Sequence, residues 1–381
     1  MTCFEEGLEM YIDRRTVLVT SLTAVGGIAV QSEGSTESSG VVSRRRVFVI
    51  GGPGNIGTST LEVLLESGNE VGLYTLPESY SDEWAKKLKF YLGDRKDSET
   101  LKSAFDDFNP DYVVDFVLFH PEQARAILNL VCGRVEQYVF VSTVDVTGYP
   151  VARIPQRESD PEVPTTTEYA ADKRACEKIF LSAFSPEEFP LTIVRPAYSL
   201  GAKFLMSFMT HDGGVYMIQR IRDERPVLVP GEGDGLFQPG NARNTGKMVA
   251  RVIGRQKAVG KIYQCGHPEL IRKDDYVRRI AGVVGREPVI VHVPVEPIVA
   301  TRHPEVRRSL LPVQTRYHLA HSVQTFLEDY PDFRFQESVE DGVREYISYQ
   351  EKQGNFADAG REIIDDKIIA AWLRCREHFH L

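Results

Sequence analysis

Apolar residues form short runs that alternate with segments of helical periodicity between residues 44 and 200. The first run, Arg46–Ile50, is mostly β-branched or aromatic and ends in glycines, which is typical of a buried parallel strand. Leu61, Leu64 and Leu65 then recur at helical spacing within 58–67, and Gly68 closes this predicted helix. Similar patterns predict strands at 70–74, 90–92, 112–119, 137–142 and 191–195, and helices at 101–108, 121–131 and 169–184. Strands that alternate with helices predict an α/β fold of the Rossmann type, a doubly wound parallel sheet with helices on both faces.

The pattern is less regular after residue 200. The segment 226–240 is rich in Pro and Gly and predicts loops, whereas 274–284 and 339–353 predict helices. The segment 363–373 predicts an amphipathic helix that packs on the body of the protein or on a second subunit. We therefore predict a Rossmann domain at 44–200 and a smaller substrate-binding lobe with a C-terminal helical extension at 201–381.

The N-terminal residues 1–43 have the pattern of a signal followed by a linker. Arg14 and Arg15 precede an uncharged, mildly apolar run that ends at Val30, and the polar segment 31–40 follows. The arginine pair resembles a twin-arginine export signal, and the run is too short and too rich in Gly, Ser and Thr to span a membrane stably. A disordered tail is the alternative, so export and a cytoplasmic location both stay open. Acidic residues before Met10 fit a signal poorly, which makes Met10 an alternative start to Met1.

Composition narrows the classes of function. The chain is 42% hydrophobic and 26% charged, as in ordinary soluble proteins. Its formal net charge of -9 argues against a nucleic-acid partner, which would need a basic stripe. Its five cysteines are scattered without a paired motif, so they predict neither a zinc site nor a disulfide framework, and we predict no metal.

The glycine-rich loop 51–57 is the strongest chemical signal, because a strand leads into it and a helix leads out of it. Gly51 permits a tight turn, Gly54 lets the backbone approach a pyrophosphate, and Gly57 lets helix and strand pack closely. The N-terminus of the helix supplies free N–H groups and a positive dipole end. We therefore expect the pyrophosphate of a dinucleotide to lie over this loop, with Asn55 and Ile56 also in contact.

The type of dinucleotide depends on the end of the second strand, where an acidic residue usually holds the adenine ribose. Thr75 stands there instead. It has no charge to repel a 2′-phosphate, so both NAD and NADP stay open as cofactors.

Tyr169 and Lys173 begin a predicted helix at a spacing that puts them on one helical face. A lysine ammonium close to a phenol favours the phenolate and lowers the pKa of the phenol. Tyr169 can then move a proton while a nicotinamide moves a hydride.

The order of motifs along the chain resembles that of the extended short-chain dehydrogenase/reductases, the NAD-dependent epimerases and dehydratases. The resemblance covers about residues 44–350 and rests on Gly51, Gly54 and Gly57, on Gly93-Asp94, on Ser142-Thr143, on Tyr169 with Lys173, and on Arg195-Pro196. It implies that Thr143 bonds the reacting substrate oxygen, that Tyr169 is the general acid and base, and that Lys173 holds the nicotinamide ribose and tunes Tyr169. It further implies that Asp94 lies at the adenine, that the second half forms a substrate lobe interleaved with the sheet domain, and that the protein is a homodimer.

Some positions depart from the family pattern. Ala197-Tyr198-Ser199 lacks the asparagine that many nucleotide-sugar enzymes of the family use to hold substrate, which argues against a UDP-sugar. Asp145 stands where dehydratases and decarboxylases of the family carry a glutamate. It is either a second acid/base or a carboxylate that caps a loop, and capping is the more common use of such a residue.

These patterns support three hypotheses of function. The first is an epimerase-like or dehydratase-like enzyme that takes a hydride from a sugar-like small molecule and returns it. The second is a net NAD(P)-dependent oxidoreductase of an alcohol or carbonyl compound. The third is a non-catalytic dinucleotide-binding scaffold, which the presence of Thr143, Tyr169 and Lys173 disfavours.

Overall fold

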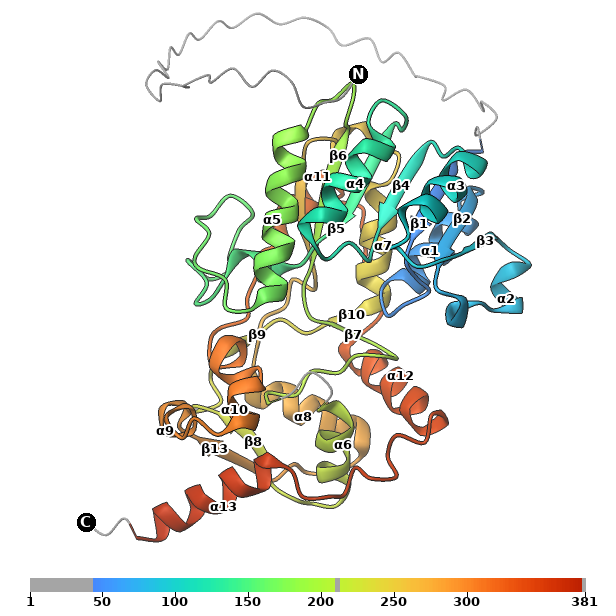
Figure 1. The fold of residues 1–381 in the computed structure, drawn as a ribbon. Helices are drawn as coiled ribbons and strands as arrows, with labels where there is room; N and C mark the ends of the chain where they lie inside the picture. Colours follow the sequence, from blue (N-terminus) through green and yellow to red (C-terminus); the bar gives the residue numbers. More distant parts are fainter. Residues whose placement is uncertain (1–43, 210–212, 379–381) are drawn as a thin grey trace, which may run out of the picture. The chain divides into compact units, whose positions relative to one another are not determined.

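A seven-stranded parallel sheet forms the centre of the protein (Figure 1). The structure is a computed structural model that describes residues 44–209 and 213–378, and Arg45–Leu381 form one compact unit. The strand order is β11-β6-β5-β4-β1-β2-β3, and every neighbouring pair is parallel. The order reverses between β1 and β4, the kind of position where doubly wound sheets bind ligands. The strands are β1 (Arg46–Ile50), β2 (Glu70–Thr75), β3 (Lys89–Leu92), β4 (Tyr112–Asp115), β5 (Gln137–Val141), β6 (Leu191–Pro196) and β11 (Ile262–Cys265).

Helices cover both faces of the sheet because alternate residues of each buried strand point to opposite sides. In β1, Val47 and Val49 pack into one apolar cluster, and Phe48 and Ile50 pack into another. Helices that pack into the first cluster are α1 (Gly57–Glu66), α7 (Ala242–Val252) and α11 (Gln324–Asp329). Helices that pack into the second cluster are α3 (Ser98–Phe108), α4 (Pro121–Val131) and α5 (Glu168–Ala183). This arrangement confirms the predicted Rossmann-type, doubly wound α/β fold.

The chain after β6 builds a second region around two further clusters of buried apolar side chains. The chain then comes back to the Rossmann domain, where β11 joins the central sheet and α7 and α11 pack against one face of it. The helices predicted at 274–284, 339–353 and 363–373 are confirmed as α8, α12 and α13. The region contains α6 (Gly214–Arg222), α8 (Lys273–Val284), α9 (Val295–Ala300), α10 (Pro304–Arg308), the π-helix η4 (Leu311–Thr315), α12 (Val339–Lys352) and α13 (Ile364–Glu377), with β8 (Val227–Pro230) paired to β13 (Ile290–Val293). Short elements elsewhere are η1 (Pro77–Ser79), α2 (Asp82–Ala85), η2 (Val144–Thr147) and η3 (Gln256–Ala258).

Two predictions of local structure were wrong. The segment 226–240 was expected to be loops, but it contains β8, β9 (Leu236–Phe237) and β10 (Gly240–Asn241). These strands pair with β13, β12 (Ile271–Arg272) and β7 (Ser199–Leu200), which lie far along the chain and are invisible to a local pattern. The strand expected at 112–119 ends at Asp115, whose carboxylate accepts a bond from Val117 N at 3.2 Å and so starts a turn.

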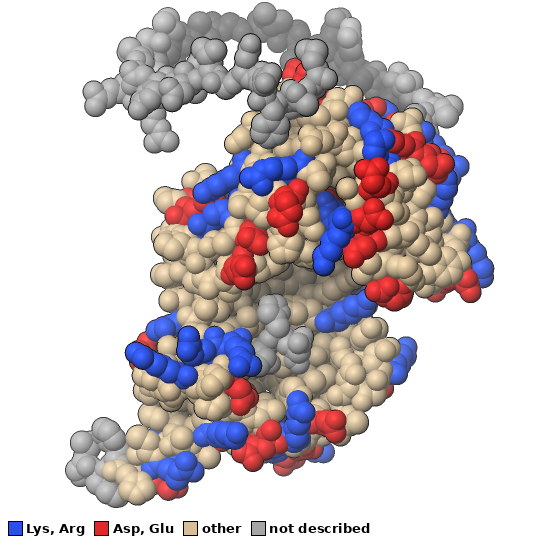
Figure 2. Space-filling model, in the orientation of Figure 1, with Lys and Arg blue, Asp and Glu red and all other residues tan. Residues whose placement is uncertain are grey.

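The signal-like segment and linker predicted for residues 1–43 lie outside the described residues. Within the described ranges, none of the helices combines the length and the apolar character that crossing a bilayer requires. Figure 2 shows a hollow across the face in view, with basic and acidic side chains interspersed above it.

Candidate active site

The glycine loop turns sharply between β1 and α1, as the sequence predicted. Gly51 and Gly52 have φ angles of +86° and +123°, a region that favours glycine. A Cβ on Gly51 would lie 2.4 Å from Val117 Cγ1, whereas a Cβ on Gly54 would meet nothing within 4 Å. The open space over Gly54 fits the close approach of a ligand. Gly57 is different, because its Cβ would lie at an ordinary 3.7 Å from Gly52, so the close packing expected there is not enforced.

The backbone amides of this loop are arranged to bind an anion. Ile56 occupies the N-cap of α1 and makes no side-chain capping bond. Among the described residues, the N–H groups of residues 54–57 donate to no backbone or side-chain acceptor. Free N–H groups at a helix N-terminus fit the pyrophosphate of a dinucleotide.

Asn55 connects the loop to a distant part of the chain. Its Nδ2 donates to Ser199 O at 2.6 Å, and its Oδ1 accepts from Lys203 N at 3.2 Å. Its side chain therefore holds the glycine loop against β7 and the residues that follow it, in addition to its expected place beside a cofactor.

A cavity of about 550 Å³ brings the glycine loop together with the predicted catalytic residues. Thr143 follows β5, and Tyr169 lies in the first turn of α5, which Thr167 caps through a bond from Ala170 N. The residues after β6 and the π-helix η4 close the cavity from the other side. Of the predicted site residues, the lining includes Gly54, Asn55, Ile56, Gly57, Thr143, Asp145, Tyr169 and Lys173.

Lys173 is buried beneath this cavity, with 1% of its surface exposed. Its Nζ donates to Val141 O at 2.9 Å and lies 4.8 Å and 4.9 Å from the ring centres of Phe119 and Phe140. Burial penalises the ammonium and lowers the pKa of Lys173 to about 8. The lysine is therefore held rigidly and carries its charge at neutral pH.

The pKa of Tyr169 runs against the expectation that Lys173 lowers it. Removal of the phenol from water and the charge of Asp145 raise this pKa and a hydrogen bond with Thr143 lowers it, which together bring the pKa of Tyr169 to about 12. Lys173 makes its hydrogen bond to Val141 O instead. At neutral pH Tyr169 is therefore a protonated phenol that shares a hydrogen bond with Thr143.

Asp145 lies in the same cavity with partners that the sequence did not indicate. Its Oδ1 accepts from Tyr149 Oη at 2.7 Å and from Gln314 Nε2 at 2.9 Å. Tyr149 Oη also bonds to Tyr198 Oη. Tyr198 was visible in the sequence as a departure from the family pattern, but Gln314 follows it by more than a hundred residues and carried no local signal.

Helix α5 is fixed to the sheet by a buried ion pair. Arg195, at the end of β6, donates to Glu177 on α5 through Nε at 3.0 Å and Nη2 at 2.5 Å. Both side chains are less than 5% exposed. Arg195, which belongs to the family's series of motifs, therefore anchors the helix that carries Tyr169 and Lys173.

Thr75 and Asp94 lie outside the lining of this cavity. Thr75 ends β2 in a buried position and pairs with Leu92 at the end of β3. Asp94 follows β3, where its Oδ1 accepts from Lys96 N at 2.8 Å. Both residues are therefore at neighbouring strand ends on the edge of the sheet that also carries the glycine loop.

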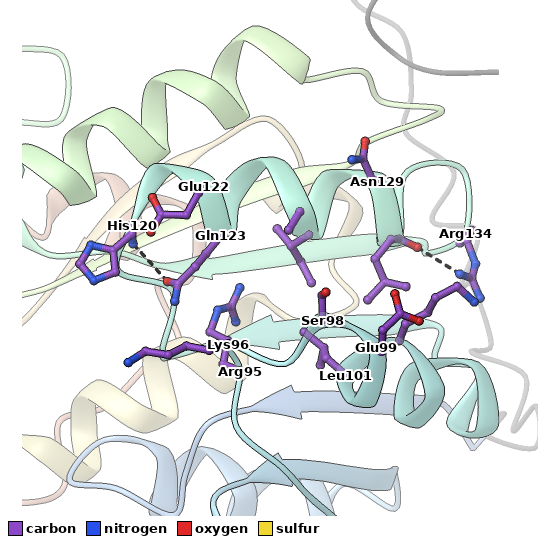
Figure 3. Close-up of a pocket in the computed structure, with 14 residues that line it drawn as sticks. Arg95, Lys96, Ser98, Glu99, Leu101, His120, Glu122, Gln123, Asn129 and Arg134 are labelled. Atoms are coloured by element: carbon purple, nitrogen blue, oxygen red, sulfur yellow. Dashed lines mark hydrogen bonds between the residues drawn. The ribbon is translucent and has the colours of Figure 1, made fainter.

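A larger groove of about 680 Å³ runs between α3 and α4 and contains none of the predicted site residues (Figure 3). Its wall includes Arg95, which is buried and pairs with Asp115 at 2.6 Å. At one end, His120 Nδ1 lies 2.8 Å from Asp172 Oδ2, on the helix that carries Lys173. The size of a cavity therefore does not by itself locate the chemistry in this protein.

Comparison with known proteins identifies the family of this chain. The profile of the NAD dependent epimerase/dehydratase family matches residues 47–129 and 122–266. The chloroplast stem-loop binding protein of 41 kDa b of Arabidopsis thaliana is 26% identical over 266 residues, which are 66% of this chain and 66% of that protein. The UDP-glucose 4-epimerase of Halalkalibacterium halodurans is 32% identical over 151 residues, which are 35% of this chain and 45% of the epimerase. The match thus covers less than two thirds of the length of either relative.

Solved structures share the fold at low sequence identity. An epimerase from Methanothermobacter thermautotrophicus superposes with a TM-score of 0.64 at 18% identity, over 84% of this chain and 96% of that one. The UDP-glucuronic acid 4-epimerase of Bacillus cereus superposes with a TM-score of 0.63 at 15% identity, over 81% of this chain and 99% of that one. These likenesses establish a common fold.

Proposed function

The chain belongs to the NAD-dependent epimerase/dehydratase family, and from this premise we propose that it oxidises a hydroxyl group of a sugar or sugar-like alcohol and reverses that oxidation within the same turnover. One observation carries the proposal, namely that a single cavity holds the glycine loop together with Thr143, Tyr169 and Lys173. A scaffold that only binds a dinucleotide would not need this second set of residues.

The proposed roles follow from the contacts of each side chain. NAD, when bound, supplies an acceptor for the hydride of the alcohol carbon and can return it. Tyr169 takes the hydroxyl proton of the substrate and gives it back when the carbonyl is reduced. Thr143 shares a hydrogen bond with the phenol of Tyr169, which supports the proposal that it also bonds the reacting oxygen. Lys173 supplies a fixed positive charge one helical turn from Tyr169.

The free amides of residues 54–57 would hold the pyrophosphate, and Thr75 and Asp94 would lie toward the adenosine half. Thr75 admits either cofactor, and the family favours NAD. The variant Thr75→Glu tests this placement, because a carboxylate there repels a 2′-phosphate. We expect weaker binding of NADP with little change for NAD in calorimetric titrations, and an equal effect on both cofactors would contradict the placement.

Asp145 is proposed as a second acid/base that acts beside the transient ketone, and its bonds to Tyr149 and Gln314 inside the cavity support this role over loop capping. Such a residue extends the chemistry from epimerisation to elimination. A net oxidoreductase is the alternative, since it would use the same three residues and release the changed cofactor. The region after residue 200, which supplies Phe204, Met206 and Gln314 to the cavity, is proposed as the substrate lobe.

The name of the chloroplast relative introduces nucleic-acid binding as a second candidate. The net charge of this chain, -9, is unfavourable for binding a polyanion. A filter-binding assay with a labelled RNA stem-loop tests this candidate, and we expect no retention at physiological salt.

Mass spectrometry of the nucleotide that co-purifies with the native protein tests the main proposal. We expect NAD(H) to remain bound after dialysis at one molecule per chain, because a cofactor that is regenerated in each turnover need not be released. We expect Tyr169→Phe to keep the nucleotide but to lose conversion of substrate. Tyr80→Phe, at a tyrosine that is 48% exposed and is not part of the cavity lining, is the matched control. A protein that binds no NAD in solution refutes the proposal, and one that consumes added cofactor in each turnover supports the net oxidoreductase.

A further inference from the structure

Four side chains next to Tyr169 form one hydrogen-bonded cluster, which we call the acceptor cluster. It comprises Asp145, Tyr149, Tyr198 and Gln314. They come from three separate segments of the chain, η2 and the residues after it, the residues after β6, and the π-helix η4. Asp145, Tyr198 and Gln314 line the cavity, and Tyr149 lies behind them with 5% of its surface exposed.

The direction of the bonds in this cluster follows from the chemistry of a carboxylate, which can only accept. Tyr149 therefore donates its proton to Asp145, at 2.7 Å. Tyr198, which bonds to the oxygen of Tyr149, must then be the donor of that pair. Burial raises the pKa of Tyr149 and that of Tyr198 well above the ordinary value, so both protons stay in place. Because the proton of Tyr198 is already used, its oxygen can act only as an acceptor; it bonds to the amide of Gln314, and its remaining lone pair can accept from a ligand in the cavity that Tyr198 lines.

Packing holds the cluster in this arrangement. The ring of Tyr149 stacks on Tyr317 with an interplanar angle of 5° and meets the ring of His321 edge-on. The π-helix that carries Gln314 is anchored by Thr315, whose Oγ1 donates to Phe208 O at 2.5 Å. A preorganised set of polar groups discriminates between ligands better than a flexible one.

Charge and size also restrict what the cavity accepts. Within the described lining, the only lysine or arginine is Lys173, and its ammonium is already bound to Val141 O. Asp145 adds a carboxylate to the same space. A phosphate group offers only acceptors and negative charge, so beside the acceptor cluster it would face the like charge of Asp145 and the oxygen of Tyr198, which cannot donate. The cavity measures about 550 Å³, and substrate must share it with the nicotinamide half of the cofactor.

We propose that the acceptor cluster selects an uncharged polyol, such as a free sugar, a simple glycoside or a cyclitol, and that it rejects a sugar linked to a nucleoside diphosphate. Two substrate hydroxyls donate to Tyr198 Oη and to the carboxylate of Asp145, while the amide of Gln314 holds that carboxylate in place. The inference rests on the proposed function and adds the class of substrate to it. It separates this chain from relatives whose names specify UDP-glucose.

Binding to the NAD-loaded full-length protein tests the proposal. The neutral probes are glucose, galactose, mannose, their methyl glycosides and myo-inositol, and the charged probes are UDP-glucose, dTDP-glucose and UDP. Saturation-transfer NMR and single-turnover NADH absorbance at 340 nm report binding and hydride transfer. We expect at least one neutral probe to saturate the protein and to reduce bound NAD, with no saturation by the charged probes.

Two substitutions assign the effect to the cluster. Tyr198→Phe removes one acceptor and should weaken binding of the neutral probe about 10-fold, as expected for one hydrogen bond of about 1.4 kcal/mol, while NAD binding shows that the variant is folded. Tyr317→Phe, which changes the neighbouring ring in the same way but outside the lining, is the control and should leave the affinity unchanged. Gln314→Arg adds a cation at the cavity and should increase binding of UDP.

The possible outcomes separate this inference from the proposed function. Tighter binding of UDP-glucose than of every neutral probe overturns the substrate class but leaves the proposed function standing. Saturation by none of the neutral probes, or an unchanged affinity in Tyr198→Phe, also overturns it. Failure of the protein to bind NAD at all would instead count against the proposed function.

Discussion

Replacing Lys173 by methionine should stabilise the fold while removing activity. The lysine is 1% exposed, and burial lowers its pKa from 10.5 to about 8. One pKa unit corresponds to about 1.4 kcal/mol, so burial disfavours the charged form by about 3 kcal/mol at pH 7. Methionine has a similar length and needs no water, but it leaves Val141 O without its donor, which costs about 1 kcal/mol. We therefore expect Lys173→Met to raise the free energy of unfolding by about 2 kcal/mol at pH 7.

The pH dependence of this gain has a definite sign. Below pH 8 the ammonium is present in both the folded and the unfolded chain, so the wild type bears the whole penalty. Between pH 8 and pH 10.5 the folded chain releases the proton first, and the penalty declines. Above pH 10.5 the lysine is neutral in both states, and the penalty is gone. The advantage of the variant should therefore be largest at neutral pH and should vanish at high pH.

Urea unfolding of both proteins at a series of pH values measures this difference, and turnover should fall by roughly 10²-fold or more because the proton-transfer site loses its cation. Lys178→Met, on the same helix at a side chain that is 68% exposed, is the control and should change stability little. A Lys173→Met protein that unfolds at lower urea concentration than the wild type would refute the reasoning. So would a stability difference that does not shrink as the pH rises.

Three further predictions concern neighbouring parts of the site. Asp145→Asn should move the ascending limb of the pH profile of single-turnover NADH formation to lower pH, because the carboxylate raises the pKa of Tyr169. An unchanged pH profile would show that the charge of Asp145 does not affect the pKa of the phenol. Glu177→Leu leaves a buried guanidinium unpaired and should cost about 3–5 kcal/mol in urea unfolding, and a loss below about 1 kcal/mol would contradict the role of the pair. Gly51→Ala places a Cβ at 2.4 Å from Val117 and should lower stability by about 1–3 kcal/mol and weaken NAD binding, both measured by calorimetry. Val117→Ala in the same chain should restore part of the loss, and no restoration would mean that the contact is not the cause.

Six strands of the central sheet were predictable because each contains a run of apolar residues, whereas β11, which includes the polar Gln264, was not predicted. In β1, four of five residues are fully buried, and the local sequence is enough to show this. The short strands β9 and β10 were missed because two residues carry no periodicity and gain their bonds from distant partners.

The candidate site was predictable only where its residues belong to a series of motifs that occur in a characteristic order along the chain. The glycine loop, Thr143, Tyr169 and Lys173 form such a series, and the cavity brings them together. Gln314 reaches Asp145 across 169 positions from a π-helix, and no sequence pattern links the two. The pKa of Tyr169 was misjudged because spacing on a helix face does not show where a lysine ammonium makes its hydrogen bond.

The side chain of Asn55 has a consequence for how this protein can be re-engineered. It is part of the loop that would hold the cofactor, and it is bonded to Ser199 O and to Lys203 N, in a segment that contributes Ser199 and Phe204 to the cavity lining. The glycine loop and residues 199–203 are therefore mechanically coupled, so a change of cofactor preference would also affect the part of the cavity proposed to bind substrate. A glycine loop transplanted from a relative without this asparagine would also release the opposite wall, so selection for a new cofactor would have to include residues 199–203.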